Sequence, residues 1–379
     1  MHHIVRRPSN LTAKRIALLV HRFGGHFGGA ESYVENLARE LSQRHEVTIF
    51  AFDYQSELKL PFVKVPVPAR APGWVKAMLY ARFAQHATAS GFDVVHSHMN
   101  GAAGQVHTVH VTPAHYHLKF RGTALRRLLG RIGIRKQAYL ALERARFGPA
   151  KQTVVVSVRL AQQIAACMPL SSEVAVVPPG VNAAQQLPGA RYRQRALLNW
   201  RSDVVACLLV ARNPQRKGLA TLIETARRLP GNYRFMIVGV DEAAAAMVMA
   251  AADVRARFVL QPPTASLGVW FAAADIYVHP TREDTFGMAP LEAMAHGVPV
   301  VLSGPRYCGF AHDLRHEQDA LLLDDPQDSQ RIAHELVRLG TDVSLRDTLV
   351  RAGLARANKS SWACVAKAYE RLYDIPTCM

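Results

Sequence analysis

The sequence predicts an α/β protein of two doubly wound domains that face each other across a cleft. Short apolar runs alternate with longer amphipathic stretches in both halves of the 379 residues, which is the pattern of parallel sheets covered by helices. A chain of this length suits two domains of ordinary size. The link Pro178-Pro179-Gly180 provides a stiff connection between the halves. We therefore expect ligands at the carboxyl ends of the strands.

The composition is that of a globular protein with a strong positive charge. Hydrophobic residues make up 49% and charged residues 20%, while the net charge is +17. Such a charge attracts nucleic acid or an anionic membrane, although an arginine-rich lineage would explain it equally well. We find no apolar run long enough to span a membrane, no signal-peptide core, and five cysteines without metal-binding spacing. We expect a cytoplasmic protein with free thiols and no metal site.

The chain begins with a βαβ unit that contains a glycine-rich loop. A buried strand is expected at 15–21, a loop at 22–31 and a second strand at 46–52. The intervening helix shows four-residue apolar spacing at Tyr33, Leu37 and Leu41. Gly28 and Gly29 allow a ligand to approach the backbone, although a plain tight turn would use them too.

Two strands with terminal histidines follow, at 93–98 and 106–110. His98, His107 and His110 lie in or at the ends of these strands. A histidine in this position usually caps a strand or bonds to the core, so a structural role alone would explain each of them.

Residues 116–151 form a strongly basic segment in which Glu143 is the single acid. Its basic residues, interleaved with apolar ones, are Lys119, Arg121, Arg126, Arg127, Arg131, Arg135, Lys136, Arg144, Arg146 and Lys151. This pattern predicts one or two amphipathic helices with a cationic face. Such a face suits anionic lipid, or it is simply solvated, and the pattern favours neither strongly.

The first half ends with strands at 153–157 and 174–177, and the domain boundary is placed after residue 182. The domains are therefore expected at 1–182 and 183–358, followed by a C-terminal segment at 359–379 that contains an amphipathic helix at 362–373.

The second half opens with a strand at 204–210 and a cationic loop at 211–218. Arg212, Arg216 and Lys217 lie between this strand and the next helix. Arginine can bind two phosphate oxygens at once and lysine adds a point charge, so the loop suits a diphosphate. The alternative is a set of surface cations beside a turn. Further strands are expected at 235–238, 257–260, 275–278, 298–302 and 321–323.

The stretch 277–303, YVHPTREDTFGMAPLEAMAHGVPVVLS, is the most informative part of the chain. It predicts a strand, a loop with Glu283 and Asp284, a helix that Gly297 ends, and another strand. The open amides at the start of this helix favour an anion. Asp284 and Glu292 can face one cavity and accept hydroxyl hydrogen bonds. Each of these acids alone would be explained by a helix terminus or a solvated surface.

As a whole, this stretch resembles the donor-binding signature of the retaining GT-B glycosyltransferases of family four. The shared pattern is an acidic residue, seven residues and a Glu, with Phe-Gly inside and Glu-Ala-Met-Ala-x-Gly-x-Pro-Val-Val after it. The family usually has Glu at the first position, where this chain has Asp284 preceded by Glu283. This departure leaves open which of the two carboxylates contacts the sugar.

The resemblance implies a role for each candidate residue. Glu292 would hold the ribose hydroxyls, Asp284 or Glu283 the sugar hydroxyls, and the amides of Phe286, Gly287 and Met288 the sugar and distal phosphate. Gly28 and Gly29 would close over the donor phosphates, and Arg212 and Lys217 would neutralise the leaving diphosphate, with Arg216 competing for the arginine role. His110 would touch the donor sugar, with His107 and His98 as reserves.

The implied function is retaining, metal-independent transfer of a hexose from a nucleotide-diphosphate sugar to a glycan or lipid-linked acceptor, with no cofactor. Similarity at 143–147 and at 178–180 points to lipopolysaccharide core sugar transferases. In the resembled enzymes the first domain binds the acceptor, the second binds the donor and the C-terminal helix crosses back to the first. The segment 116–151 would then dock on the inner face of the cytoplasmic membrane.

Two other classes of protein remain as alternatives. A GT-B sugar epimerase or a phosphorylase would keep the fold, although no motif for the cofactor lysine of a glycogen-type phosphorylase is present. A basic nucleic-acid-binding protein would explain the charge, but no recognition motif is found and the phosphate-site motifs would go unexplained. We therefore expect no nucleic-acid partner.

Overall fold

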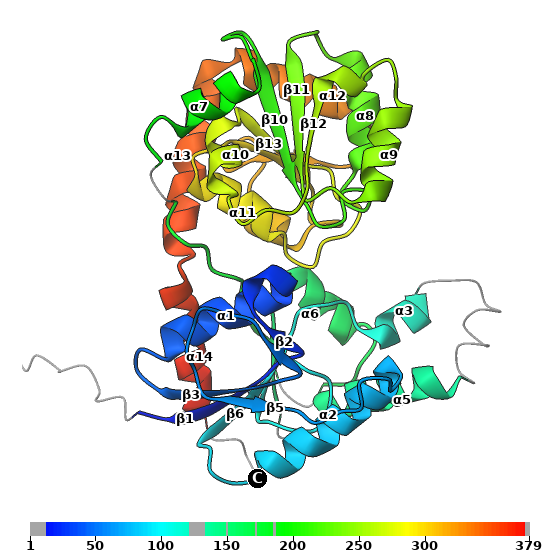
Figure 1. The fold of residues 1–379 in the computed structure, drawn as a ribbon, viewed down its shortest axis with the longest axis vertical. Helices are drawn as coiled ribbons and strands as arrows, with labels where there is room; N and C mark the ends of the chain where they lie inside the picture. Colours follow the sequence, from blue (N-terminus) through cyan, green and yellow to red (C-terminus); the bar gives the residue numbers. More distant parts are fainter. Residues whose placement is uncertain (1–12, 121–132, 149–150, 171–172, 185–186, 376–379) are drawn as a thin grey trace, which may run out of the picture.

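The computed structural model describes residues 13–120, 133–148, 151–170, 173–184 and 187–375. It contains two large parallel sheets, each flanked by helices, that form the lower and upper halves of Figure 1. The predicted fold of two doubly wound α/β domains is confirmed.

The first sheet has the strand order β5-β3-β1-β6-β7-β8-β9. Its strands are β1 (Arg15–Leu19), β3 (Glu46–Ala51), β5 (Phe62–Lys64), β6 (Val94–Ser97), β7 (Val106–Val109), β8 (Gln152–Val155) and β9 (Ala175–Val176). A small separate sheet pairs β2 (Arg22–Phe23) with β4 (Asp53–Tyr54). The strand order reverses between β1 and β6, which is where doubly wound sheets bind ligands.

Helices flank this sheet on both faces. They are η1 (Gly25–Phe27), α1 (Gly29–Leu41), α2 (Gly73–Ala87), α3 (Ala114–Phe120), α5 (Ile134–Arg146) and α6 (Val158–Ala165). The buried face of α1 presents the residues that the four-residue spacing predicts, Tyr33, Leu37 and Leu41.

The second sheet has the equivalent order β12-β11-β10-β13-β14-β15 and reverses between β10 and β13. Its strands are β10 (Val205–Val210), β11 (Tyr233–Val238), β12 (Phe258–Gln261), β13 (Ile276–His279), β14 (Val300–Ser303) and β15 (Leu321–Leu323). The helices of this half are α7 (Ala190–Leu197), α8 (Leu219–Arg228), α9 (Glu242–Ala250), η2 (Arg255–Arg257), α10 (Gly268–Ala273), α11 (Met288–Ala295), η3 (Gly309–Asp313), α12 (Ser329–Thr341) and α13 (Val343–Lys359), and α14 (Trp362–Tyr373) returns to the first domain.

Every strand of the two large sheets that the sequence predicts is present, with ends that differ by no more than two residues. The sequence analysis missed β5 and the pair β2 and β4. These strands have only two or three residues each, so they lack the buried apolar run on which the other assignments rest.

The C-terminal helix α14 lies against the first domain, on the opposite side of the molecule from α5 (Figure 1). The hydroxyl of Tyr369 lies 2.9 Å from that of Tyr33 on α1 and 2.7 Å from Thr108 Oγ1 on β7. The Tyr373 hydroxyl lies 2.8 Å from His96 Nδ1 on β6. These contacts are buried, so the last helix of the chain completes the core of the first domain.

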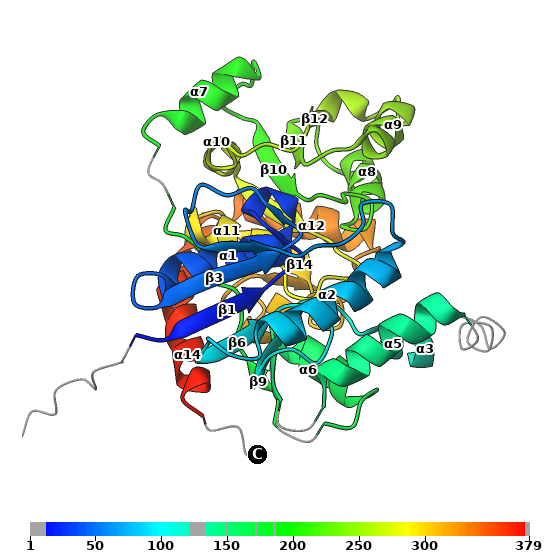
Figure 2. The same cartoon turned by 60° about the horizontal axis from the view of Figure 1, so that its bottom comes forward.

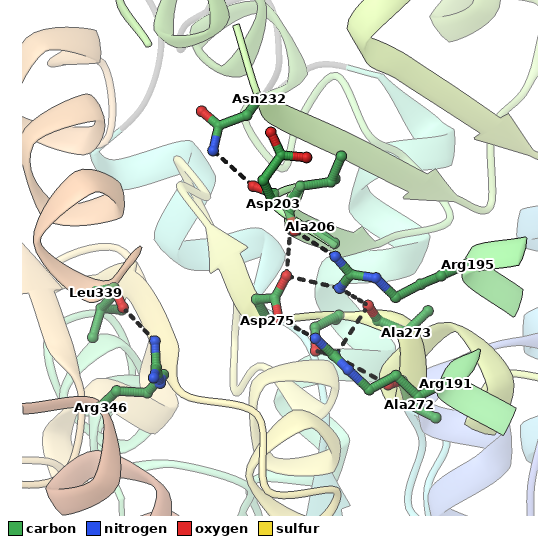
Figure 3. A network of polar contacts seen from close by, with 12 residues as sticks. Arg191, Arg195, Asp203, Ala206, Asn232, Ala272, Ala273, Asp275, Leu339 and Arg346 are labelled. Carbon is green, nitrogen blue, oxygen red and sulfur yellow. Dashed lines mark hydrogen bonds and ion pairs between the residues drawn. The ribbon is translucent and has the colours of Figure 1, made fainter. Parts of the chain in front are cut away.

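A carboxylate at the start of β13 joins α7 to the second sheet (Figure 3). Asp275 accepts hydrogen bonds from the Ala206 amide at 2.7 Å and from Arg195 Nη1 at 3.0 Å. Arg191 Nη2 forms an ion pair with the other oxygen at 2.5 Å. This network lies at the amino ends of β10 and β13, so it holds the end of the sheet that faces away from the first domain.

Replacing Tyr369 by Phe tests the docking of α14. The substitution removes a hydroxyl that connects three elements inside the core, so the free energy of unfolding should fall by roughly 1–3 kcal/mol. Urea denaturation measures the change. Tyr192→Phe is the matched control because Tyr192 is 80% exposed. Equal stability of the two variants would contradict the buried network.

Candidate functional site

A cavity of about 580 Å³ lies between the two domains. Its lining includes Gly28, Gly29, Ser32, Arg212, Met288 and Glu292. A neighbouring cavity of about 290 Å³ shares Ser32, Met288 and Glu292 with it. In Figure 1 the helices α1 and α11 lie between the two sheets, Figure 2 shows both helices with the first domain turned forward, and the cavity contains residues from the start of each. The reversal points of both sheets therefore face one shared space.

The helices α1 and α11 begin at this cavity without a side-chain cap. Each follows a glycine, Gly28 or Gly287, and no side chain among the described residues bonds to the amides of the first turn. Side chains cap the first turns of α6, α9, α12, α13 and α14, namely Ser157, Asp241, Asp328, Asp342 and Ser361, whereas α2, α5, α7, α8 and α10 lack a side-chain cap as well. The open amides and the helix dipoles favour an anion in the cavity.

Two glycines fix how the loops of the second domain fit together. Gly218 has φ +95°, and a Cβ there would lie 2.2 Å from the Pro280 carbonyl oxygen. Gly287 has φ +108°, and a Cβ there would lie 2.9 Å from Cys308 Sγ. Only glycine suits both the backbone angle and the space at these positions. The loop after β10 therefore packs directly on the loop after β13.

This packing brings Lys217 to Asp284. Lys217 Nζ forms an ion pair with Asp284 Oδ2, and His279 Nε2 lies 3.0 Å from the same oxygen. Burial alone would raise the pKa of Asp284, but Lys217 and His279 hold it well below its usual range. Burial lowers the pKa of His279 despite the neighbouring Asp284. Asp284 is therefore ionised at neutral pH and His279 is uncharged.

Glu292 presents its carboxylate to both cavities from the second turn of α11. Its two carboxylate oxygens make no hydrogen bond or ion pair with any residue in the described part of the chain, although its backbone carbonyl oxygen lies 2.9 Å from His296 Nδ1. Although the side chain is open to the cavity, the protein around it displaces water and raises the pKa of Glu292 to about 6. A carboxylate in this setting gains from hydroxyl donors supplied by a ligand.

The two candidate arginines occupy different positions. Arg212 lines the cavity, and its Nη1 donates to the Phe27 carbonyl oxygen of the other domain at 2.5 Å. Arg216 is exposed and does not line the cavity, and its amide bonds to Asn213 Oδ1 at 3.0 Å. The structure thus brings Arg212, but not Arg216, to the cavity.

The two candidate acids of the loop after β13 also contact different residues. Glu283 Oε1 lies 3.5 Å from Thr112 Oγ1 in the first domain, whereas Asp284 contacts Lys217. The Phe286 side chain is buried against Phe310, so this residue can offer a ligand only its backbone. The sequence analysis did not single out His279, although a polar residue at the carboxyl end of a strand five residues before an acid would have been a usable signal.

The three candidate histidines lie in the first domain, and none of them lines the two cavities. His110 Nε2 lies 2.8 Å from His98 Nδ1, and its ring meets the Tyr33 ring edge-on at 4.9 Å. Burial, together with nearby Arg146, lowers the pKa of His110 to about 3. His107 Nε2 lies 3.1 Å from the Gly104 carbonyl oxygen. A contact between His110 and the sugar of the donor stays a prediction.

The basic segment is only partly described, because residues 121–132 and 149–150 lie outside the described residues. Within it, the assignment of Arg146 to a cationic outer face is wrong, because Arg146 is only 4% exposed and donates to Asn100 Oδ1 at 2.9 Å. The single acid, Glu143, is buried too and accepts the Ala114 and His115 amides that begin α3. The sequence pattern predicts a helix that contains Glu143 and Arg146, but it cannot show which parts of the protein this helix packs against.

Within the described ranges, no three His, Cys, Asp or Glu side chains are grouped so that they could hold a metal ion. Of the helices in that part of the chain, none combines the length and the apolar character needed to cross a bilayer. In the turn after β15, Asp325 accepts a hydrogen bond from the Gln327 amide and Asp328 accepts one from the Arg331 amide.

Family comparisons match both halves of the chain. Residues 27–185 match the model described as Glycosyltransferase Family 4, and residues 204–342 match the model described as Glycosyl transferases group 1. The chain is 26% identical to a D-inositol 3-phosphate glycosyltransferase of Acidothermus cellulolyticus, over 89% of this chain and 83% of that protein.

Two further relatives support the fold. The chain is 24% identical to the lipopolysaccharide glucosyltransferase WaaG of Escherichia coli, over 92% of this chain and 93% of WaaG. A crystal structure of WaaG superposes with a TM-score of 0.80 at 19% identity, covering 95% of this chain and all of that chain. The Anabaena protein HepE in complex with UDP-glucose superposes with a TM-score of 0.74 at 16% identity, covering 96% of this chain and all of HepE.

Replacing Glu292 by Gln tests the electrostatics of the cavity. A carboxyl whose pKa rises from 4.5 to about 6 on folding binds more protons in the folded than in the unfolded state between these pH values. Stability from this group therefore falls as pH rises through that window. The variant should unfold less readily than wild type above pH 6, by up to about 2 kcal/mol.

The gain should shrink as the pH is lowered toward 5, and urea denaturation between pH 5 and 8 measures it. Glu46→Gln, at an exposed position on β3, is the control. A Glu292→Gln variant that is equally or less stable than wild type at every pH would contradict the conclusion that desolvation raises the pKa of this carboxyl group.

Proposed function

The chain belongs to the GT-B glycosyltransferases, with a family 4 domain followed by a group 1 domain, and we propose that it transfers a hexose with retention of anomeric configuration. The donor is a nucleoside diphosphate sugar, and the acceptor is a glycan or a lipid-linked sugar of the cell envelope. The transfer uses no metal ion and no cofactor.

The observation that carries this proposal is the cavity where the starts of α1 and α11 meet the side chains of Arg212 and Glu292. Uncapped helix starts and a guanidinium group are suited to a diphosphate. The complex of HepE with UDP-glucose supports a nucleotide sugar as the ligand of this fold. We place the diphosphate between α1 and α11.

Glu292 recognises the ribose in this proposal. Its two carboxylate oxygens have no partner among the described residues, and they can accept the 2′ and 3′ hydroxyls together. These hydrogen bonds favour the charged carboxylate and offset the desolvation that raises its pKa.

Asp284, rather than Glu283, contacts the transferred sugar. Its Oδ2 is occupied by Lys217 and His279, while no residue that the structure describes bonds to Oδ1. That oxygen is available to a sugar hydroxyl. Glu283 extends instead toward Thr112 of the first domain, where it lies on the acceptor side.

The reaction breaks the bond between the anomeric carbon and the diphosphate oxygen. The acceptor oxygen forms its bond to the same face of that carbon, and the acceptor proton passes to an oxygen of the departing phosphate. Lys217 and Arg212 stabilise the negative charge that grows on the leaving group, which is the dominant contribution in this kind of chemistry. No side chain acts as a nucleophile.

The acceptor binds against the first domain. WaaG acts on lipopolysaccharide by its name, and similarity to it supports an envelope glycan as the acceptor. We place the enzyme on the inner face of the cytoplasmic membrane, with the exposed basic residues of α5 toward anionic lipid.

The test is a turnover assay with UDP-glucose and with its GDP and ADP analogues, with and without a lipopolysaccharide core acceptor. Release of nucleoside diphosphate that depends on the acceptor, and an α-linked product by proton NMR, would support retaining transfer. Release of free, epimerised sugar without an acceptor would instead identify an epimerase. A β-linked product would contradict retention.

Replacing Lys217 by Ala should lower kcat at least ~100-fold, because it removes a charge aimed at the leaving group. Thermal unfolding of the variant separates lost chemistry from lost folding, since Asp284 would be left without its cation. Arg201→Ala removes an exposed cation of the same domain and should behave as wild type. Lys217→Ala activity within a few fold of wild type would rule out this assignment.

Charge reversal on α5 tests the membrane surface. Arg135→Glu with Arg144→Glu should weaken binding to phosphatidylglycerol vesicles, because each arginine near such a surface contributes ~1 kcal/mol. Co-sedimentation measures the binding, and phosphatidylcholine vesicles give the uncharged reference. Arg201→Glu with Arg228→Glu, in the second domain, is the charge-matched control. Equal binding of both double variants would contradict docking through α5.

A further inference from the structure

The carboxylate that we assign to the sugar is one methylene shorter than the glutamate that the family pattern has at this position. A shorter side chain reaches less far, so its orientation depends more strongly on its neighbours. In this chain a histidine contacts that carboxylate: His279, the last residue of β13, lies with its Nε2 3.0 Å from Asp284 Oδ2.

We propose that His279 is a positioning residue that holds Asp284 through a neutral Nε2–H donor, so that Asp284 Oδ1 faces the sugar. The proposal rests on the proposed function for the identity of the ligand. The His279 ring does not touch the substrate and acts only through Asp284.

The protonation state of the ring follows from its neighbours. Asp284 is ionised and can only accept hydrogen bonds, so the proton must lie on His279 Nε2. The other nitrogen, Nδ1, lies 3.5 Å from the hydroxyl of Tyr277, whose ring stacks on the imidazole with an interplanar angle of 22°. The Tyr277 hydroxyl also donates to the Val210 carbonyl oxygen at 3.3 Å, which connects the histidine to β10.

The surroundings make this arrangement rigid. His279 is 2% exposed, and Ser303 donates to its backbone carbonyl oxygen at 3.3 Å, independently of the ring. The titratable groups around the Asp284 carboxylate come from several elements: Lys217 from the loop after β10, Tyr277 and His279 from β13, Glu292 from α11, and Cys308 from the segment before η3. Among these groups, Lys217 supplies the positive charge next to the Asp284 carboxylate, and His279 fixes the orientation of that carboxylate. A lysine ammonium can rotate, whereas a buried imidazole cannot.

The alternative is that the buried ring only fills space beside β13. A space-filling residue would be replaceable by any side chain of similar volume, and its loss would affect UDP and UDP-glucose alike. A positioning residue would be replaceable only by another N–H donor, and its loss would affect only the sugar. These expectations separate the two roles.

The experiment compares His279→Leu, which removes the donor, with His279→Gln, whose amide can still donate to Asp284. Each is made in the wild type and in an Asp284→Asn background, and calorimetry gives Kd for UDP-glucose and for UDP. On the wild type, GDP with GDP-glucose and ADP with ADP-glucose are measured first as well. The variants are then tested with the nucleotide and nucleotide sugar that bind the wild type.

We expect His279→Leu to weaken UDP-glucose on the order of tenfold with little change for UDP, and His279→Gln to stay near wild type. In the Asp284→Asn background, His279→Leu should cost nothing more. The acid limb of UDP-glucose binding should move to higher pH in His279→Leu, because the pKa of Asp284 rises when a hydrogen bond to its charged form is lost.

Equal weakening of UDP and UDP-glucose, or an unchanged loss in the Asp284→Asn background, would overturn the proposal. If no nucleotide sugar binds the wild type, the proposed function fails and this proposal fails with it. If the wild type binds UDP-glucose more tightly than UDP and His279→Leu keeps the same preference, the proposed function stands and the role of His279 is wrong.

A measurement on the wild type covers the case in which His279→Leu does not fold. Nitrogen-15 NMR of histidine-labelled protein, with His279→Gln for assignment, should show His279 neutral at pH 7 with its proton on Nε2. A charged ring, or a proton on Nδ1, would overturn the proposal.

Discussion

The contact between Lys217 and Asp284 joins the two loops that follow β10 and β13, and the candidate site depends on it. The loops leave adjacent strands at the reversal point of the second sheet, and they pack so closely that Gly218 has no room for a side chain. Loss of either partner would leave a buried charge uncompensated, at a cost of roughly 3–5 kcal/mol. The same pair therefore fixes the loop geometry and supplies the charge that the proposed chemistry needs.

Around this pair, the protein leaves polar groups open at the positions where a ligand would satisfy them. The starts of α1 and α11 line the cavity without a side-chain cap, and the Glu292 carboxylate has no partner among the described residues. Open amides favour an anion and an open carboxylate favours hydroxyls. One ligand with a diphosphate next to a ribose would satisfy both, which is why the arrangement argues for a nucleotide sugar more strongly than any one residue does.

The sequence predicted the strands and the loops of the site well, because buried parallel strands are continuous apolar runs and the loops after them carry distinctive residues. It could not choose between Arg212 and Arg216 or between Glu283 and Asp284. Neighbours in a loop have the same chemistry, and only the packing of the loops decides that Arg212 lines the cavity and that Asp284 contacts Lys217. The burial of Arg146 was missed for a related reason, since helical periodicity identifies a face of α5 but not its neighbours. The donor base and the acceptor depend on contacts that no local pattern encodes.

The most direct test of the account is a thermal-shift series with UDP, GDP, ADP and CMP, each with and without EDTA, and with single-stranded DNA at low and high salt. A ligand that binds only the folded state raises the melting temperature by mass action. The account predicts a selective rise with one nucleoside diphosphate that EDTA leaves unchanged. No rise with any nucleotide, together with a salt-sensitive rise with DNA, would contradict it and identify the positive charge as a nucleic-acid-binding surface.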